Sequence, residues 1–194
     1  RNIDIELLGM EFQSGDSFYS GVFAGFERLP FDFNLSGKAT LAAGSAYSFF
    51  RYFGGFNTAT RRRVALNAQY VGGGFYSGTR TQYTISLGIR PRAGVLITLD
   101  NQWNRIELPE GRFSTSVPRL TALLQFGPWK SLSNNVQYDN ISRVIGWQSR
   151  FRWIMRPGND VYLVYQHNWI SDPTGLRTSL DRSFATKVNF TKRF

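Results

Sequence analysis

Few residues of this chain could support covalent chemistry, and His167 is the central one because it is the only histidine and there is no cysteine. A histidine beside a serine on a neighbouring strand can act as the base for a serine nucleophile, and Ser149 is the candidate partner. If residues 157–159 form a three-residue link, an antiparallel ladder places His167 opposite Ser149. A two-residue turn at Gly158–Asn159 places His167 opposite Arg150 and on the other face of the sheet. The sequence leaves both registers open.

Catalysis is the least favoured interpretation of His167. The residue lies on the same side of a predicted strand as Tyr165 and Trp169. A histidine near a tryptophan in such a strand usually packs at a membrane interface. Hydrolysis of a lipid by His167 with Ser149 therefore stays a hypothesis. We assign no catalytic residue and expect that the protein is not an enzyme.

Metal binding is not expected either. With one histidine and no cysteine, a metal site would need carboxylates, and the candidate aspartates do not have the spacing of a calcium loop. These residues are Asp139, Asp160, Asp172 and Asp181. We interpret them as turn formers, because Asp side chains accept hydrogen bonds from the backbone of tight turns. The sequence thus predicts neither a metal nor a cofactor.

Arginine is the most informative polar residue type. The chain has 23 Lys and Arg against 13 Asp and Glu, a net charge of +10. Six arginines lie on the polar side of predicted strands or at their ends: Arg63, Arg90, Arg119, Arg150, Arg152 and Arg156. In a closed barrel they would face the lumen and attract anions. The alternatives are ion pairs with carboxylates of neighbouring strands, or contacts with lipid phosphates, which the run at residues 61–63 also suits.

Nucleic acid is not an expected partner. Aromatic residues of a single-strand binding surface share the basic face, where bases can stack on them. Here the aromatic residues alternate onto the apolar side instead, as Trp147 and Trp153 do relative to Arg150 and Arg152.

The elements that would position these residues are strands, because the sequence repeats with a period of two. Near the C-terminus, for example, Phe184, Val188 and Phe190 alternate with Lys187 and Asn189. The predicted strands are 1–11, 17–29, 44–56, 62–72, 79–90, 94–106, 114–126, 131–139, 142–156, 160–171 and 181–194. No linker or low-complexity tract interrupts them, so we expect a single domain over residues 1–194.

These strands have the length and pattern of membrane-spanning strands. They run for about 9 to 14 residues, and a strand that crosses a bilayer needs about 9 to 11. Short links that contain proline alternate with longer links, as periplasmic turns alternate with outer loops in bacterial barrels. We therefore expect an all-β protein with a transmembrane antiparallel up-and-down β-barrel in the bacterial outer membrane. A soluble barrel that holds a ligand is the alternative fold.

The predicted number of strands is odd, whereas single-chain bacterial barrels have an even number and both ends in the periplasm. The chain also starts at Arg1 without the pattern of a signal peptide. Either one strand is miscounted, within about 10 to 12 visible strands, or strands precede Arg1. We favour the second interpretation and expect the C-terminal part of a larger barrel, lacking upstream strands or an N-terminal domain.

The C-terminal sequence resembles the signal by which Gram-negative barrels are recognised by their assembly machinery. Its residues are Phe184, Val188, Phe190 and the terminal Phe194. The resemblance implies that the barrel assembly machinery is a partner, together with the lipid bilayer and its lipopolysaccharide.

Further segments resemble an uncharacterised family of C-terminal outer-membrane barrels, often found behind a periplasmic sandwich similar to the family-nine carbohydrate-binding modules. The segments are Pro30-Phe31, Gly44-Ser45-Ala46-Tyr47, Arg61-Arg62-Arg63, Gly73-Gly74-Phe75-Tyr76-Ser77-Gly78, Arg90-Pro91, residues 104–111, Gln137-Tyr138-Asp139-Asn140, Arg150-Phe151-Arg152-Trp153 and residues 156–165. The resemblance implies a fold and a location but no reaction, since no catalytic residue set is established for the family.

Three functions are compatible with these predictions. The first is a porin-like conduit or translocation pore whose arginine-rich lumen favours anionic solutes such as acidic saccharides. The second is a membrane anchor that displays an upstream binding domain and transports nothing. The third, a lipid-modifying enzyme centred on His167, is the least favoured.

Overall fold

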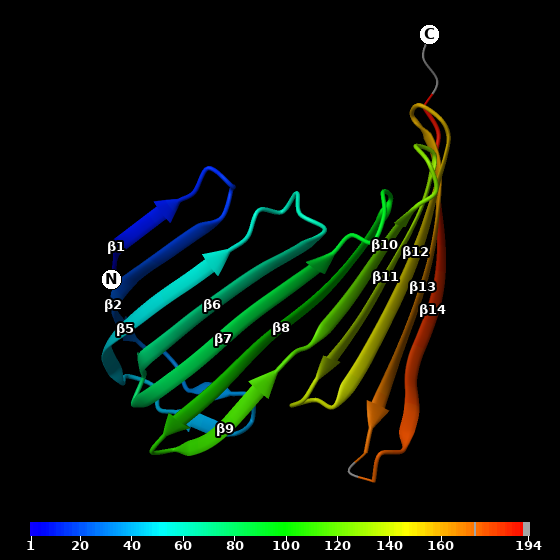
Figure 1. The fold of residues 1–194 in the computed structure, drawn as a ribbon. Coiled ribbons are helices and arrows are strands. Elements are labelled where there is room, and N and C mark those ends of the chain that lie inside the picture. The colour runs from blue at the N-terminus through cyan, green and yellow to red at the C-terminus, as the bar shows by residue number, and fades with distance from the viewer. Residues whose placement is uncertain (173, 192–194) are drawn as a thin grey trace. The chain divides into compact units, whose positions relative to one another are not determined.

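The computed structural model describes residues 1–172 and 174–191, and it consists of strands, turns and loops (Figure 1). Eleven strands follow one another in one antiparallel up-and-down order. They are β1 (Asn2–Glu11), β2 (Ser17–Arg28), β5 (Ala46–Asn57), β6 (Val64–Phe75), β7 (Gly78–Ile89), β8 (Val95–Leu108), β10 (Arg119–Gln125), β11 (Lys130–Asp139), β12 (Val144–Arg156), β13 (Asn159–Ser171) and β14 (Arg177–Asn189). None of the described residues forms a helix that could cross a membrane.

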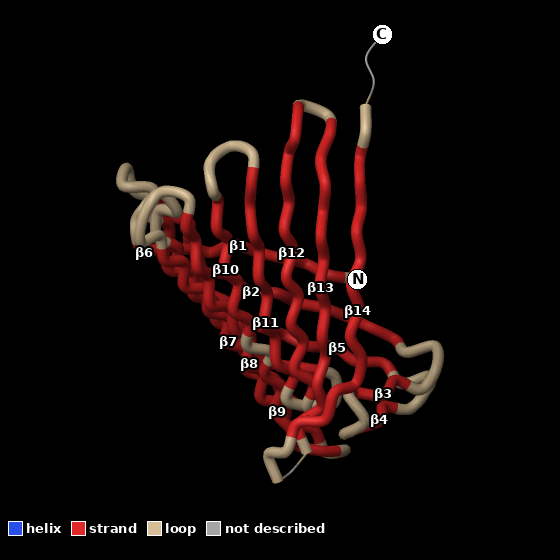
Figure 2. The backbone as a smooth tube through the Cα atoms, turned by 90° about the vertical axis from the view of Figure 1, so that its right-hand side faces the viewer, coloured by secondary structure: helices blue, strands red, loops and turns tan. Residues whose placement is uncertain are grey.

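The eleven predicted strands correspond to these eleven elements, with two differences. The predicted strand at 114–126 is divided into β9 (Gly111–Ser116), which pairs with β8, and β10. Pro118 lies between them and lacks the N–H that a continuous ladder would use. The link at 30–43 contains a hairpin of β3 (Phe33–Leu35) and β4 (Ala39–Leu41), both labelled in Figure 2.

The predicted all-β, antiparallel architecture is confirmed, but a closed barrel is not. Strands β1 and β14 stand at the two ends of the pairing order, and no ladder joins them in the described part of the chain.

The chain forms two compact units. The first contains Arg1–Leu87 and Asn101–Ser116, and the second contains Gly88–Asp100 and Val117–Phe194. In the second unit, β11 to β14 carry mostly polar side chains on one face and mostly apolar side chains on the other. One face carries rows of paired polar residues, and we call it the amide face. An example is the row of Asn135 on β11, Gln148 on β12 and Gln166 on β13. Rows such as Val136, Trp147 and His167 pair on the other, which we call the apolar face.

The first unit has the same two-sided construction, with more aromatic residues. On one side Phe23 pairs with Arg51, and Gly25 pairs with Phe49; we call this the Arg51 face. On the other, Val22 pairs with Tyr52, and we call this the Tyr52 face. Glycine leaves space for the rings of the Arg51 face, since a Cβ at Gly25 would lie 2.6 Å from the Phe49 ring.

A small apolar core lies in the first unit, where the β3–β4 hairpin packs against the strands. Its buried members are Leu29, Ala39, Leu41, Phe75, Ile106 and Leu108. Leu41 is the most enclosed large side chain, with 1% of its surface exposed. The hairpin is therefore held by hydrophobic contacts over β6 and β8, and is not a free loop.

Candidate functional site

Two of the six arginines predicted to line a lumen form ion pairs within the second unit. Arg119 Nε lies 3.5 Å from Asp100 Oδ2 on the neighbouring strand. Arg152 Nη2 lies 2.8 Å from Asp160 Oδ2. The Asp160 carboxylate also accepts hydrogen bonds from Tyr162 Oη and Asn189 Nδ2, each at 2.9 Å. Asp160 is thus a buried ion-pair partner on a strand, and the prediction of a turn former was wrong for it.

The other four arginines lie in different settings. Arg150 is exposed on the amide face, where it pairs with Ser133 and Val164. Arg156 pairs with Asn159 beyond a bulge that follows Ile154, so it does not continue the alternation of Arg150 and Arg152. Arg90 directly follows β7, and Arg63 lies in the exposed link before β6.

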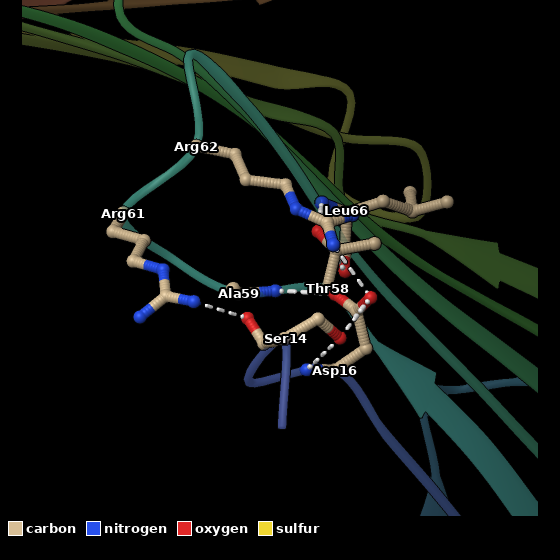
Figure 3. Close-up of polar contacts among 7 residues, drawn as sticks. All are labelled: Ser14, Asp16, Thr58, Ala59, Arg61, Arg62 and Leu66. Carbon is tan, nitrogen blue, oxygen red and sulfur yellow. Dashed lines mark hydrogen bonds and ion pairs between the residues drawn. The ribbon is translucent and has the colours of Figure 1, made fainter. Parts of the chain in front are cut away.

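The neighbouring arginines at residues 61–62 fasten a turn of the first unit, as Figure 3 shows. Arg61 Nη2 donates to the Ser14 carbonyl at 2.8 Å, and Arg62 Nη2 lies 2.6 Å from Asp16 Oδ2. The Ala59 backbone N–H donates to Asp16 Oδ1 at 2.9 Å. The hydrogen bond from the Ala59 N–H is the main cause that lowers the pKa of Asp16. The hydrogen bonds from the Ser14 hydroxyl and from Arg62 lower this pKa further. These contacts join the β1–β2 turn to the β5–β6 link.

Sequence reasoning missed two partly buried arginines, Arg51 and Arg80. The Arg51 guanidinium lies 4.3 Å from the ring centroid of Phe49 and 5.3 Å from that of Phe75. Arg80 lies 4.8 Å from the centroid of Phe75. Among the described residues, no carboxylate forms an ion pair with either guanidinium. The sequence does contain a signal for Arg51. It lies at every second position of β5 with Phe49 and Phe53, so the three side chains share one face.

Aromatic residues extend this cluster towards the β3–β4 hairpin. Tyr76, in the turn between β6 and β7, contacts Phe49 edge-on at 6.3 Å, Phe33 of β3 at 5.7 Å and Tyr47 at 5.4 Å between centroids. Burial raises the pKa of Tyr76, and a hydrogen bond to Glu27 raises it further. The two arginines therefore lie beside an aromatic wall with one carboxylate at its edge.

The amide face of the second unit carries a groove of about 370 Å³ lined mainly by amide side chains, together with the Asp139 carboxylate, Val144 and Trp147. Its lining includes Asn135, Gln137, Gln148, Gln166 and Asn168. Gly146 has no side chain between Gln137 and Asn168, with which it pairs, and so opens the groove. The Asn135 Oδ1 atom is buried and lacks a hydrogen-bond partner in the described structure. Amides arranged in this way can donate to and accept from the hydroxyl groups of a sugar.

The Tyr52 face of the first unit bears a row of aromatic side chains, one on each of four successive strands. Neighbouring ring centroids are 5.7 Å apart for Tyr52–Tyr70, 5.1 Å for Tyr70–Tyr83 and 5.6 Å for Tyr83–Trp103. On one side of the row, Val64 and Ile85 are more than 45% exposed. On the other side lie the exposed Phe50 and Arg105. Outer-membrane barrels carry such aromatic girdles at the membrane interface.

Both registers that the sequence left open for His167 were wrong. Residues Pro157 and Gly158 form a two-residue link, because Arg156 pairs with Asn159. The bulge before Arg156 then shifts the ladder, so that His167 pairs with Trp147, and Ser149 pairs with Tyr165. His167 and Ser149 share the apolar face without facing each other. The serine that contacts His167 is Ser179 of β14, with 2.8 Å between Nε2 and Oγ.

The aspartates at two turns behave as predicted. Asp139 accepts hydrogen bonds from the Ile141 N–H at 2.8 Å and the Ser142 hydroxyl at 2.9 Å. Asp172 accepts bonds from the Thr174 N–H and the Leu176 N–H, both at 2.9 Å. Asp181 lies within β14 and pairs with Asn168, so the prediction of a turn former was wrong for it as well. In the described part of the chain, no group of three or more His, Asp or Glu residues is placed to hold a metal ion.

Three of the four residues of the predicted C-terminal signal are described. Phe184 pairs with Tyr165 and Val188 pairs with Val161, both on the apolar face of β14. Phe190 follows the end of β14 and is 74% exposed. Phe194 lies outside the described residues.

Comparison with known proteins gives no family. No protein-family model matches the chain, and no curated protein matches it significantly.

Proposed function

We propose that this chain is an outer-membrane β-barrel protein that serves as a conduit for anionic solutes such as acidic saccharides. The observation that carries the proposal is the pair Arg51 and Arg80, which has an aromatic wall and no ion pair to a carboxylate in the described structure. Partly desolvated arginines that are not ion-paired favour an anion that passes close to them.

Insertion into a membrane is supported by the apolar side of each unit. The large side chains there are exposed, including Ile3 at 63% and Phe50 at 57% in the first unit and Leu99 at 50% in the second. Exposed apolar surface on this scale is unfavourable in water, but favourable against lipid.

The amide groove supports a saccharide as the solute. Its amide groups offer hydrogen-bond donors and acceptors that match sugar hydroxyls. Arg150 and the paired Arg152 lie on the same face of β12. An acidic sugar would thus meet amides for its hydroxyls and arginines for its carboxylate or sulfate.

The test is ion selectivity in a planar bilayer that contains the purified protein. We expect anions to be favoured over cations under a salt gradient, and the preference to fall in the double variant Arg51→Gln, Arg80→Gln. Arg105→Gln is the matched control, because this exposed arginine lies beyond the aromatic row on the Tyr52 face. Cation selectivity in the parent, or equal selectivity in the parent and the double variant, would contradict the proposal.

A specific observation favours an anchor as the second candidate. The β3–β4 hairpin packs on Phe75, Ile106 and Leu108, so it covers part of the first unit. If it blocks the conduit, the parent should not conduct. A variant in which a short Gly-Ser linker replaces residues 32–42 should then conduct, and this result would identify the hairpin as a plug.

A further inference from the structure

His167 lies between two hydroxyl groups on the apolar face of the second unit. Its Nδ1 is 3.2 Å from Tyr165 Oη, and its Nε2 is 2.8 Å from Ser179 Oγ. The imidazole also stacks on the Trp169 indole, with 3.8 Å between the ring centroids and 30° between the planes. This stacking limits rotation of the imidazole. The contacts therefore run from a hydroxyl that could act as nucleophile (Ser179) to a base (His167) and on to a group that orients the base (Tyr165).

A bulge in β14 brings Ser179 to this face. Trp169 pairs with Ser179, whereas the preceding Asn168 pairs with Asp181, so Leu180 is an extra residue. Side chains three positions apart in a regular strand point to opposite faces. Because of the bulge, Ser179 and Arg182 both lie on the side of His167, with which Arg182 pairs. Bulges are common where a sheet aims a functional side chain.

We propose that Ser179, His167 and Tyr165 form a hydrolytic site for the acyl esters of membrane lipids. The surroundings suit an acyl chain, since the row of His167 continues through Trp147 and Val136 to Leu120. Phe184, which pairs with Tyr165, is 66% exposed. Arg182 supplies a cation beside the nucleophile for the negative oxygen of the tetrahedral intermediate. This activity is separate from the proposed conduit, which uses the opposite face.

The reaction follows from the hydrogen bonds. His167 Nδ1–H donates to Tyr165 Oη, which leaves Nε2 free to accept the Ser179 proton. Ser179 Oγ attacks the ester carbonyl as His167 takes that proton. The bond between the carbonyl carbon and the oxygen of the alcohol then breaks. His167 gives its proton to that oxygen, and the alcohol leaves. Water attacks the acylated Ser179 with His167 again as base, which releases a fatty acid and restores the serine.

The test uses the full chain folded into vesicles. One set of vesicles contains only phosphatidylethanolamine and phosphatidylglycerol, and the other also contains lipopolysaccharide. Released fatty acids are identified by mass spectrometry, so their chain lengths show whether phospholipid or lipid A is cleaved. In parallel, a long-chain alkyl sulfonyl fluoride should modify Ser179, which peptide mass spectrometry locates. We expect modification of Ser179 and fatty acid release from one of the two lipids.

Variants separate this site from its surroundings. Ser179→Ala and His167→Asn should each lower release by at least about a hundredfold, and both should prevent modification at residue 179. Ser149→Ala is the matched control, since this serine shares the face and pairs with Tyr165 but does not contact His167. Circular dichroism and resistance to protease establish that each variant is folded. No release from either lipid, or equal release by the parent and Ser179→Ala, would overturn the proposal.

Discussion

The Arg51 guanidinium lies over the Phe49 ring, 4.3 Å from its centroid, while Arg51 Nε donates to the Gly74 carbonyl at 2.8 Å. The backbone bond fixes one edge of the guanidinium, and the ring covers one of its faces. Two residues of one strand and a glycine of the next thus hold a charge in place without an ion pair to a carboxylate. In the proposed conduit, the remaining donor groups of Arg51 would bind an anion.

Removal of the Phe49 ring should weaken the packing around Arg51. Phe49→Leu removes a cation–π contact of about 0.5 to 2 kcal/mol and leaves Gly25 without its covering ring. We expect a lower free energy of unfolding, by about 1 to 3 kcal/mol, in urea titration of the folded protein in micelles. Phe50→Leu is the control, because the adjacent Phe50 faces the other way and is 57% exposed. An equal loss in both variants would show that the contact with Arg51 adds nothing.

Leu41 should hold the β3–β4 hairpin in place. Its side chain is 1% exposed, and truncation of a buried leucine typically costs about 2 to 5 kcal/mol. Leu41→Ala should therefore make the hairpin more sensitive to protease and raise the conductance of single channels. Thr40→Ser, on the exposed side of β4, keeps the hydroxyl that accepts a hydrogen bond from Asn34 Nδ2 at 3.2 Å and should change neither. Unchanged cleavage and conductance in Leu41→Ala would show that the hairpin is held by other contacts.

Much of the architecture could be predicted from the sequence because alternation depends on local spacing. The C-terminal alternation of Phe184 and Val188 with Lys187 and Asn189 is present in β14. The bonds that Asp139 accepts likewise follow from its position at a turn. In each case the neighbours along the chain determine the structure.

Contacts across strands could not be predicted, because they depend on register. The bulge near Met155 moved the partner of His167 to Trp147, and the bulge at Leu180 brought Ser179 to the same face. A shift of one residue reverses the face of every following side chain. Nothing in the local sequence marks either bulge, so the contact between His167 and Ser179 came only from the structure.

Protonation of Asp16 should weaken the turn that it fastens. Its pKa is lowered in the folded protein, chiefly by the Ala59 N–H and then by the Ser14 hydroxyl. An acid whose pKa is depressed stabilises the fold above its unfolded pKa of about 3.9, and this contribution is lost as the pH falls through the folded value. Hydrogen exchange at the Ala59 amide should therefore accelerate, beyond its intrinsic pH dependence, when the pH falls below about 4. The acceleration should be absent in Asp16→Asn and should remain in Asp172→Asn, which alters a different turn. An acceleration that persists in Asp16→Asn would assign the effect to another group.

A pair of arginine substitutions tests whether the apolar face of the second unit contacts lipid. Leu120 and Thr121 are adjacent in β10, and Leu120 belongs to the apolar face through its pairing with Val136, whereas Thr121 pairs with Asn135 of the amide face. Arginine on a lipid-facing position near the middle of a bilayer costs about 2 to 4 kcal/mol, while a lumen position tolerates it. Leu120→Arg should accordingly lower the free energy of folding into phospholipid vesicles by that amount in urea titrations, and Thr121→Arg should leave it nearly unchanged. A soluble barrel would place Leu120 in its apolar interior and would also be destabilised by Leu120→Arg, but it would fold in buffer without vesicles. Folding of the parent in lipid-free buffer, or tolerance of Leu120→Arg in vesicles, would therefore exclude the membrane-embedded barrel.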